Sequence, residues 1–157
     1  MKKIIFLCIN IVLLSCFCFS ENSSQSKRLS FINNAYKYLN IPYKYAGTDK
    51  TGMDCSGLIY RSALETLNLS LPRSAAAIAS FVSKIENKDI QPGDLLFFNT
   101  VGNSISHVGI YIGNGEFIHS ASQGAKTGVL ISSLKEKYWK NTYRFAGRIL
   151  PKEKIFE

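Results

Sequence analysis

The sequence predicts a single α+β domain in which the helices come first and an antiparallel sheet of about five strands follows. At 157 residues, of which 46% are hydrophobic, the chain is long enough for one domain with a real core but hardly for two. Apolar residues recur at helical spacing before residue 83, and short strand-like runs fill the part after residue 94. Because the strands follow the helices instead of alternating with them, a doubly wound parallel sheet is not expected.

Residues 1–20 form the expected secretory signal and do not belong to the domain. Two lysines follow the first methionine, an apolar run interrupted by Asn10 covers residues 4–14, and small or polar residues come next. A retained membrane anchor is the alternative, although even through Phe19 the run is shorter than the roughly 20 residues that span a bilayer. We therefore expect an exported protein of the periplasm or cell envelope.

Two sites of signal cleavage remain open. Residues 18–20 suit ordinary signal peptidase, whereas residues 13–16 resemble a bacterial lipobox, in which Cys16 would be acylated and anchor the protein to lipid. The two outcomes differ in tethering and share the same domain. The expected boundaries after the signal are a flexible, serine-rich lead-in over residues 21–28, the domain over residues 29–151 and a tail over residues 152–157.

Three helices are expected in the first half of the domain. The spacing of apolar residues predicts the first over residues 29–39, and a loop rich in tyrosine, glycine and polar residues follows over 42–52. The second helix has Asp54 as its N-cap and an apolar face that continues to Asn68. A short alanine-rich helix is expected over residues 74–82.

The second half of the domain is expected to form the sheet. Turn residues at 91–94 precede the first strand, and one or two helical turns are expected over residues 134–139. The strand-like runs cover residues 95–98, 107–112, 117–121, 129–131 and 143–150.

Cys55 is the only cysteine outside the leader, so the folded domain has no partner with which to form an internal disulfide. A single unpaired cysteine in an exported protein indicates a reactive thiol. At the start of a helix, unpaired N–H groups and the positive end of the helix dipole favour the thiolate and are expected to lower the pKa of Cys55. The alternative is a small buried residue with a purely structural role.

His107 and His119 are the only histidines in the chain, and both lie in strand-like runs. A nucleophilic cysteine needs a base and a third group that orients this base, and two histidines supply both. Structural strand histidines are one alternative. A zinc site built from Cys55 and the two histidines is another, but it lacks an evident fourth ligand, so neither a metal nor another cofactor is expected.

The turn between the two strands decides whether the histidines can meet. A two-residue turn at 114–115 would place them on opposite faces of the sheet. A three-residue loop at 113–115 would place His119 opposite Gly109 and diagonal to His107, with about 7 Å between the Cβ atoms of the histidines. We predict the three-residue loop, with Gly109 leaving room for the two rings.

The net charge gives weaker information about partners. Without residues 1–20, the formal charge of +8 becomes +6, from 17 basic and 11 acidic residues. This balance favours an anionic partner such as a wall polymer, a lipid surface or nucleic acid. Because the basic residues are scattered along the chain, a solvated surface is the preferred interpretation, and no nucleic-acid partner is expected.

Five motifs in order resemble those of the NlpC family of papain-like cysteine peptidases, over about residues 30–150. They are Asp54-Cys55-Ser56-Gly57, Leu71-Pro72-Arg73-Ser74, Pro92-Gly93-Asp94-Leu95, His107-Val108-Gly109-Ile110-Tyr111 and Phe117-Ile118-His119. The resemblance implies a papain-like minimal core and a bacterial cell-wall peptidase that cuts the stem peptide of peptidoglycan, typically between D-γ-glutamyl and the diamino acid. We expect a monomer that binds this stem peptide.

The resemblance also implies roles for single residues. Cys55 resembles the nucleophile, His107 the base and His119 the polar residue that orients the base. Tyr43 matches a family tyrosine near the nucleophile, although a loop aromatic that packs onto the domain is the alternative. The residues expected to bind substrate are Tyr43, Asp54 and Arg73.

Two segments depart from the family pattern. Ala46-Gly47 replaces a double glycine, and residues 74–77 replace a stretch that usually contains serine and glutamine. Both border the expected substrate groove, so the subsite preference stays open. The predicted function is an exported peptidoglycan endopeptidase. The alternatives are a wall-binding module that has lost turnover, and an amidase or acyltransferase that acts on another amide or on a lipid.

Overall fold

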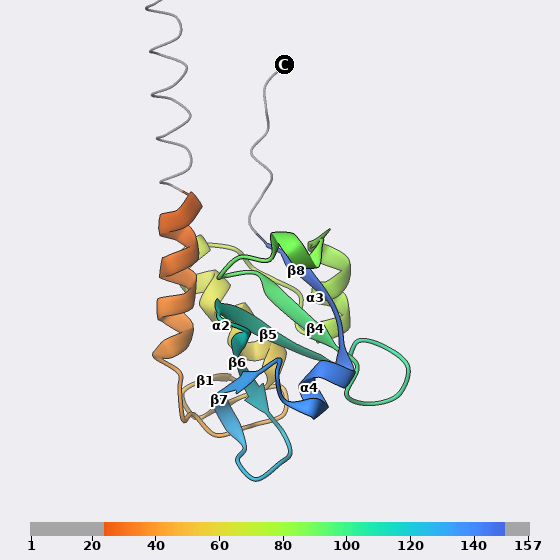
Figure 1. Cartoon of the computed structure of the whole chain (residues 1–157). Coiled ribbons are helices and arrows are strands. Elements are labelled where there is room, and N and C mark those ends of the chain that lie inside the picture. The colour runs from red at the N-terminus through yellow and green to blue at the C-terminus, as the bar shows by residue number, and fades with distance from the viewer. Residues whose placement is uncertain (1–23, 150–157) are drawn as a thin grey trace, which may run out of the picture.

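The computed structural model describes residues 24–149, and both cleavage sites, Cys16, residues 21–23 and the tail lie outside the described residues. The described chain forms the predicted α+β domain (Figure 1). Its elements are a helix over residues 24–36, β1 (Thr48–Asp49), β2 (Gly52–Met53), α2 (Cys55–Leu67), α3 (Ala75–Phe81), β3 (Ser83–Ile85), the 3₁₀ helix η1 (Asn87–Asp89), β4 (Leu95–Phe98), β5 (His107–Gly113), β6 (Glu116–Ala121), β7 (Gly128–Ser133), α4 (Lys137–Thr142) and β8 (Tyr143–Arg148).

The central sheet has six antiparallel strands in the order β3-β8-β4-β5-β6-β7. The five predicted strands are all present. The sequence does not predict β3, because its three residues at the sheet edge lack an alternation of buried and exposed side chains. Nor does it predict the β1–β2 hairpin in the expected loop, whose strands of two residues each are too short to show a period.

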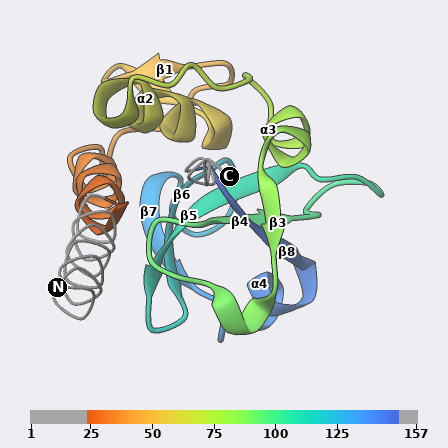
Figure 2. The ribbon, with the colours of Figure 1, turned by 90° about the horizontal axis from the view of Figure 1, so that it is seen from above.

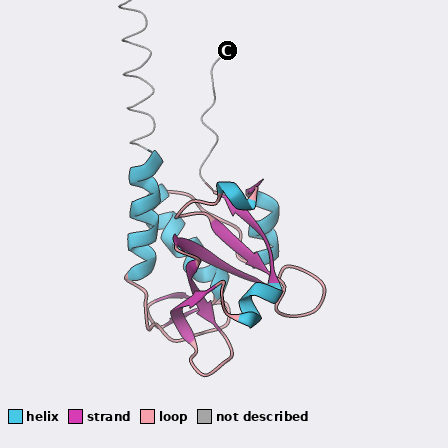
Figure 3. Cartoon of the chain, viewed as in Figure 1, coloured by secondary structure: helices cyan, strands magenta, loops and turns pink. Residues whose placement is uncertain are grey.

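Helices cover both faces of the sheet. Figure 2 shows α2 and α3 on one side of the strands and α4 on the other. Figure 3 shows the same arrangement by type of element, with the helix over residues 24–36 standing beside the sheet. Among residues 24–149, no helix combines the length and the apolar character needed to cross a bilayer.

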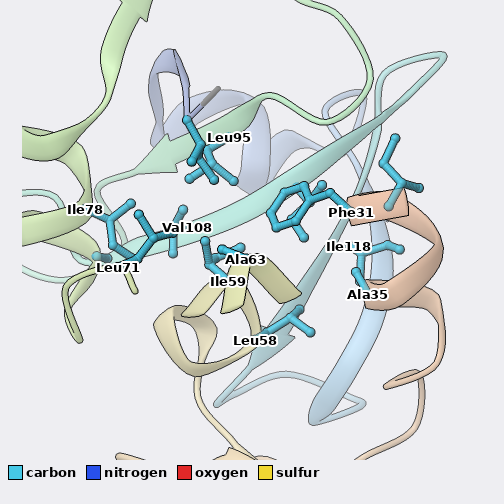
Figure 4. Packing of buried hydrophobic residues seen from close by; sticks show 14 of the residues in the cluster. Phe31, Ala35, Leu58, Ile59, Ala63, Leu71, Ile78, Leu95, Val108 and Ile118 are labelled. Carbon is cyan, nitrogen blue, oxygen red and sulfur yellow. The ribbon is translucent and has the colours of Figure 1, made fainter. Parts of the chain in front are cut away.

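The main core lies between α2, α3 and one face of the sheet (Figure 4). Leu58 and Ile59 of α2 pack there with Val108 of β5, and all three are fully buried. Each such side chain stabilises the fold by about 1.5–3 kcal/mol on burial. A second cluster on the opposite face, which we call the aromatic cluster, consists of Leu96, Phe98, Phe117, Trp139 and Ala146.

The first described helix differs from its prediction, because it covers residues 24–36 instead of 29–39. Residues 24–28, expected in a flexible lead-in, are helical. Arg28 donates to Asp94 at 2.9 Å, and Arg148 donates to the same fully buried carboxylate at 2.8 Å. These long-range ion pairs attach the start of the helix to the sheet. The polar sequence of residues 24–28 does not predict this contact.

The helical segment before β8 also lies later than predicted. Instead of covering residues 134–139, α4 begins at Lys137. The backbone N–H of Ser133 donates to Oε1 of Glu136 at 2.7 Å, which holds a turn ahead of the helix. As a result, Trp139 lies inside α4 and is buried against the sheet.

Candidate active site

Cys55 is the first residue of α2, and the predicted N-cap is confirmed. Asp54 has an extended backbone, and its Oδ1 accepts a hydrogen bond from the backbone N–H of Gly57 at 2.6 Å and another from Oγ of Ser56 at 2.9 Å. These bonds satisfy donors at the helix start that would otherwise lack a partner. The candidate nucleophile therefore lies at a well-defined helix N-terminus.

The loop before α2 packs against the helix at two glycines. A Cβ added to Gly57 would lie 2.0 Å from the carbonyl oxygen of Gly47, so only glycine permits this contact. Ala46, where the family pattern has a glycine, has a left-handed backbone with φ of 57°. The departure noted in the sequence therefore falls on a position whose conformation favours glycine.

The β5–β6 hairpin combines the two turns considered from the sequence. Ile110 lies opposite Ile118, which is the register expected for the three-residue loop. Near the turn, however, the register shifts, and only Asn114 and Gly115 form the turn, with φ of 56° and 81°. The predicted three-residue loop is therefore wrong. The extra residue, Ile112, forms a bulge in β5, and this bulge restores the predicted register in the body of the hairpin.

This register brings the two histidines together on one face of the sheet. Nε2 of His107 lies 3.0 Å from Nδ1 of His119, and the ring centroids are 5.0 Å apart. A Cβ added to Gly109 would lie 3.2 Å from Cβ of His119, so the missing side chain leaves the space that the sequence suggested. On its other side, Nε2 of His119 lies 3.0 Å from Oγ of Ser132 on β7.

The aromatic cluster encloses the two imidazoles. The indole of Trp139 stacks on His107 with centroids 5.3 Å apart and meets the ring of His119 edge-on at 4.6 Å. Phe98 and Phe117 contact the same rings from the sheet. His119 is fully buried and His107 nearly so. Water is therefore largely excluded from the pair.

Burial determines the protonation of the histidines. It lowers the pKa of His107 to about 4, because an imidazolium would lose its hydration there. The same effect, with the neighbouring charge of His107 as a smaller cause, lowers the pKa of His119 to about 2. Both rings are therefore neutral at pH 7, and each has one ring N–H to donate and one nitrogen to accept.

The sulfur of Cys55 lies against the backbone of β5. The amide of Val108, the residue after His107, and the amides of Ser56 and of Cys55 itself favour its ionised form. Burial nevertheless outweighs these amides, and together with the carboxylate of Asp54 it raises the pKa of the thiol to about 11. The amides at the helix start therefore act in the expected direction, but the predicted net lowering of the pKa is wrong, and the thiol is neutral at pH 7.

Tyr43 lies beside the candidate nucleophile. Burial raises the pKa of its hydroxyl, and the neighbouring charges of Cys55 and Asp54 raise it further. A parallel bridge between Tyr43 and Met53 attaches this part of the loop to the strand that leads into α2. The structure thus brings the predicted tyrosine to the helix start.

Asp54 and Arg73 are joined to each other. Nη2 of Arg73 donates to Oδ2 of Asp54 at 3.3 Å, and Nη1 donates to Oγ of Ser56 at 3.2 Å. Both oxygens of Asp54 are thus bonded within the protein, whereas the side chain of Arg73 is 34% exposed. The Asp54 carboxylate supports the helix start, and the guanidinium keeps an open side.

Ser132 and Trp139 belong to the site, and the sequence does not predict them. Ser132 lies in a polar pair at the end of a strand, and Trp139 lies in a segment expected to be a simple helical turn. The fact that Trp139 is the only tryptophan was the one available signal. Across residues 24–149, no three His, Cys, Asp or Glu side chains are grouped so that they could hold a metal ion.

A helix that begins at a cysteine and packs on an antiparallel sheet with a buried histidine pair is an arrangement expected of a cysteine peptidase. The chain belongs to the NlpC/P60 family, whose model matches residues 40–148. The resemblance drawn from the five motifs is confirmed.

Named relatives and solved structures agree with this family. The chain is 39% identical over 110 residues to the murein DD-endopeptidase MepS/murein LD-carboxypeptidase of Escherichia coli K12, covering 70% of this chain and 56% of that protein. It is 41% identical over 128 residues to the gamma-DL-glutamyl hydrolase of Bacillus subtilis, covering 78% of this chain and 30% of that protein. The chain therefore spans less than two thirds of the length of these relatives.

A solved NLP/P60-family protein from Staphylococcus aureus, described as similar to a lipoprotein, has the same fold. It superimposes with a TM-score of 0.70 at 29% identity, covering 81% of this chain and 42% of that protein. The α+β architecture with its antiparallel sheet is thus that of known NlpC/P60 domains.

Proposed function

We propose that this protein is an exported endopeptidase that hydrolyses an amide bond in the stem peptide of peptidoglycan, with Cys55 as the nucleophile. The observation that carries the proposal is the buried contact of 3.0 Å between His107 and His119. His107 directly precedes Val108, whose backbone amide faces the sulfur of Cys55. The names of the Escherichia coli and Bacillus subtilis relatives support a wall peptide as the substrate.

Because Cys55 and both histidines are neutral at rest, the first proton transfer runs from the thiol to His107. Because Nε2 of His107 faces His119, Nδ1 is the ring nitrogen left to accept the thiol proton. As the sulfur of Cys55 attacks the scissile carbonyl carbon, its proton passes to Nδ1, and the carbonyl π electrons move onto oxygen. Backbone N–H groups at the start of α2 stabilise the resulting oxyanion. His107 acts as a general base during the attack instead of forming an ion pair beforehand.

The rest of the reaction uses the same imidazole. His107 returns its proton to the leaving amine as the C–N bond breaks, which leaves an acyl thioester on Cys55. A water molecule then attacks the thioester, giving one proton to His107 and its oxygen to the acyl carbon. Collapse of this intermediate releases the carboxylic acid and regenerates the thiol. No metal or other cofactor enters these steps.

Direct substrate contacts are assigned to two of the three predicted residues, Tyr43 and Arg73. The Tyr43 hydroxyl beside the sulfur is suited to contact the scissile carbonyl, and the open side of the Arg73 guanidinium is suited to a carboxylate of the stem peptide. Asp54 acts through the helix start that it caps and through Arg73. We assign the bond between D-γ-glutamyl and the diamino acid as the one cleaved, and the DD-endopeptidase name of the Escherichia coli relative supports the cross-link as the rival bond.

The cellular place of the protein is also part of the proposal. The apolar leader over residues 4–14 supports export to the periplasm or cell envelope, where peptidoglycan is found. The lipobox-like residues 13–16 support a lipid anchor at Cys16. Mass spectrometry of the mature N-terminus distinguishes an acylated Cys16 from a cut near Ser20. A retained leader would contradict cleavage at either site and would favour the membrane anchor.

The activity is tested by digestion of purified muropeptides. The wild type is expected to release shortened stems, and Cys55→Ala is expected to release none. Cleavage at D-γ-glutamyl changes the stem mass, whereas cleavage of the cross-link turns dimers into intact monomers. The control is Ser133→Ala, which removes a hydroxyl whose hydrogen bond is to the N–H of Lys135. Intact substrate after exhaustive digestion by the wild type would contradict the activity. Binding to whole peptidoglycan without products would favour a silent wall-binding module, and transfer to another acceptor would favour an acyltransferase.

A further inference from the structure

The hydrogen-bonded chain of the site does not end at His119. The pairing of β6 with β7 places Leu130 opposite His119. Ser132, two residues further along β7, is therefore the diagonal neighbour of His119 on the same face of the sheet. Oγ of Ser132 lies 3.0 Å from Nε2 of His119 and is half-buried. Both nitrogens of His119 are thus engaged, one by His107 and the other by Ser132.

The role of His107 as a base determines the direction of this chain. To accept a proton at Nδ1, neutral His107 must carry its own proton on Nε2, so it donates to Nδ1 of His119. His119 must then carry its proton on Nε2, and this N–H needs an acceptor. The hydroxyl oxygen of Ser132, 3.0 Å from Nε2, is the group placed to accept it.

We infer that Ser132 is a positioning residue that sets the tautomer of both histidines, by accepting the Nε2–H of His119 and thereby directing the free Nδ1 of His107 toward Cys55. The inference rests on the proposed function, because the role of His107 as a base gives the chain its direction, but the tautomers themselves are measured without any substrate. Ser132 touches neither substrate nor sulfur in this scheme and acts only through His119.

A hydroxyl suits this position better than a carboxylate. None of the ion pairs among residues 24–149 includes a histidine, so no carboxylate stabilises an imidazolium at the pair. A carboxylate next to His119 would favour a charged ring inside the aromatic cluster. Ser132 can accept this hydrogen bond without adding charge, so both rings remain neutral. Because a hydroxyl can also donate, the direction of the chain comes from the role of His107 as a base, and Ser132 supports that direction as the acceptor of the Nε2–H of His119.

The tautomers are measured directly by long-range ¹⁵N–¹H NMR of the imidazoles at pH 7. The chain has two histidines, so His119→Gln assigns both sets of signals. We expect the Nε2–H form for both rings in the wild type and in Ser132→Thr, which keeps the hydroxyl. Ser132→Ala should give a mixture of tautomers at His119. Ser133→Ala is the matched control and should leave the spectrum unchanged.

Turnover of muropeptides supplies the second measurement. Ser132→Ala is expected to lower kcat by about tenfold, the effect of one lost hydrogen bond in a buried network, with little change in KM. Ser132→Thr should recover most of the rate. If the wild type cleaves no substrate, the proposed function fails, and the NMR result still decides the tautomers.

Two outcomes would overturn the inference. One is a wild-type His119 with its proton on Nδ1, which would reverse the direction of the chain. The other is a Ser132→Ala protein whose histidine spectrum matches that of the wild type. If Ser132→Ala does not fold, Ser132→Cys, whose sulfur is a much weaker acceptor than the hydroxyl oxygen, takes its place, and a histidine spectrum equal to that of the wild type would again overturn the inference.

Discussion

The buried histidine pair should make the folded protein sensitive to mild acid. In the unfolded chain both imidazoles titrate near the ordinary pKa of 6.5, whereas in the folded protein the pKa values are lowered to about 4 for His107 and about 2 for His119. Between pH 6.5 and 4 the unfolded state therefore binds more protons than the folded state. The free energy of unfolding must fall as the pH is lowered through this window.

The size of the effect follows from the two shifts. Each unit of pH below 6.5 costs about 1.4 kcal/mol for a histidine that stays neutral in the folded state. At pH 5 this amounts to about 2 kcal/mol for each ring, or about 4 kcal/mol for the pair, relative to pH 7. Because small domains have unfolding free energies of about 5–15 kcal/mol, this loss is a large part of the total.

Carboxylates do not obscure the measurement in this range. The pKa values of Asp49 and Glu65 are lowered from 3.8 and 4.5, so their contributions are retained above these values and lost only at lower pH. A comparison of pH 7 with pH 5 therefore isolates the histidines.

Urea unfolding at pH 7 and pH 5 provides the assay, with the fluorescence of the single tryptophan as the probe. Trp139 contacts both histidines and therefore reports on the site itself. His119→Gln removes one titrating ring, so it should reduce the drop in unfolding free energy between the two pH values by about 2 kcal/mol. Ser133→Ala, as the control, should keep the full drop.

Two results would refute this reasoning. A wild type whose unfolding free energy is equal at pH 7 and pH 5 would mean that the rings are not held neutral by burial. A His119→Gln variant that keeps the whole drop would mean that the protons bind elsewhere on unfolding.

Two further substitutions test the local geometry. In Gly109→Ala the new Cβ would lie 2.6 Å from Cδ2 of Phe117 and 3.2 Å from Cβ of His119, so we expect a loss of about 1–3 kcal/mol in urea unfolding and at least a tenfold slower turnover. A stable variant with an unchanged rate would show that the two strands can separate without cost to the site. In Ala46→Gly, relief of the left-handed φ of 57° offsets the extra entropy of glycine, so the unfolding free energy should change by less than about 1 kcal/mol. Ala76→Gly inside α3 should lose about 1 kcal/mol, and an equal loss in both variants would contradict the conformational argument.

The parts of the site that the sequence predicts are those set by short-range rules. An N-cap aspartate and an apolar helical face place Cys55 at the start of α2. Side-chain alternation along two strands places His107 and His119 on one face, and this holds even though a bulge at Ile112 replaces the expected loop. A bulge and a longer turn change the register by the same one residue, so the pattern alone does not separate them.

The parts that the sequence does not predict depend on contacts between distant segments. Asp94 binds Arg28 across 66 residues, and this contact orders a segment that looks like a polar linker. Ser132 reaches His119 only because β6 and β7 pair in one register, and that pairing has no local signal at a polar strand end. The pKa of Cys55 follows from how deeply α2 packs on β5, so a rule based on the helix start alone gives the wrong direction.

The same packing that makes the site geometrically precise also removes its resting charge. Trp139 and the two phenylalanines fix the imidazoles by surrounding them, and by doing so they deprive both rings of the water that an imidazolium needs. If a thiolate and an imidazolium were present before the substrate binds, both would lack hydration for as long as the site is at rest. If the charges instead arise during attack, the negative charge develops on the carbonyl oxygen, and in the proposed mechanism the amides at the start of α2 stabilise it there. Burial of Cys55 is therefore compatible with catalysis only if a neutral acceptor lies ready beside it, and the proposed direction of the chain from His107 through His119 to Ser132 would keep Nδ1 of His107 free for this role.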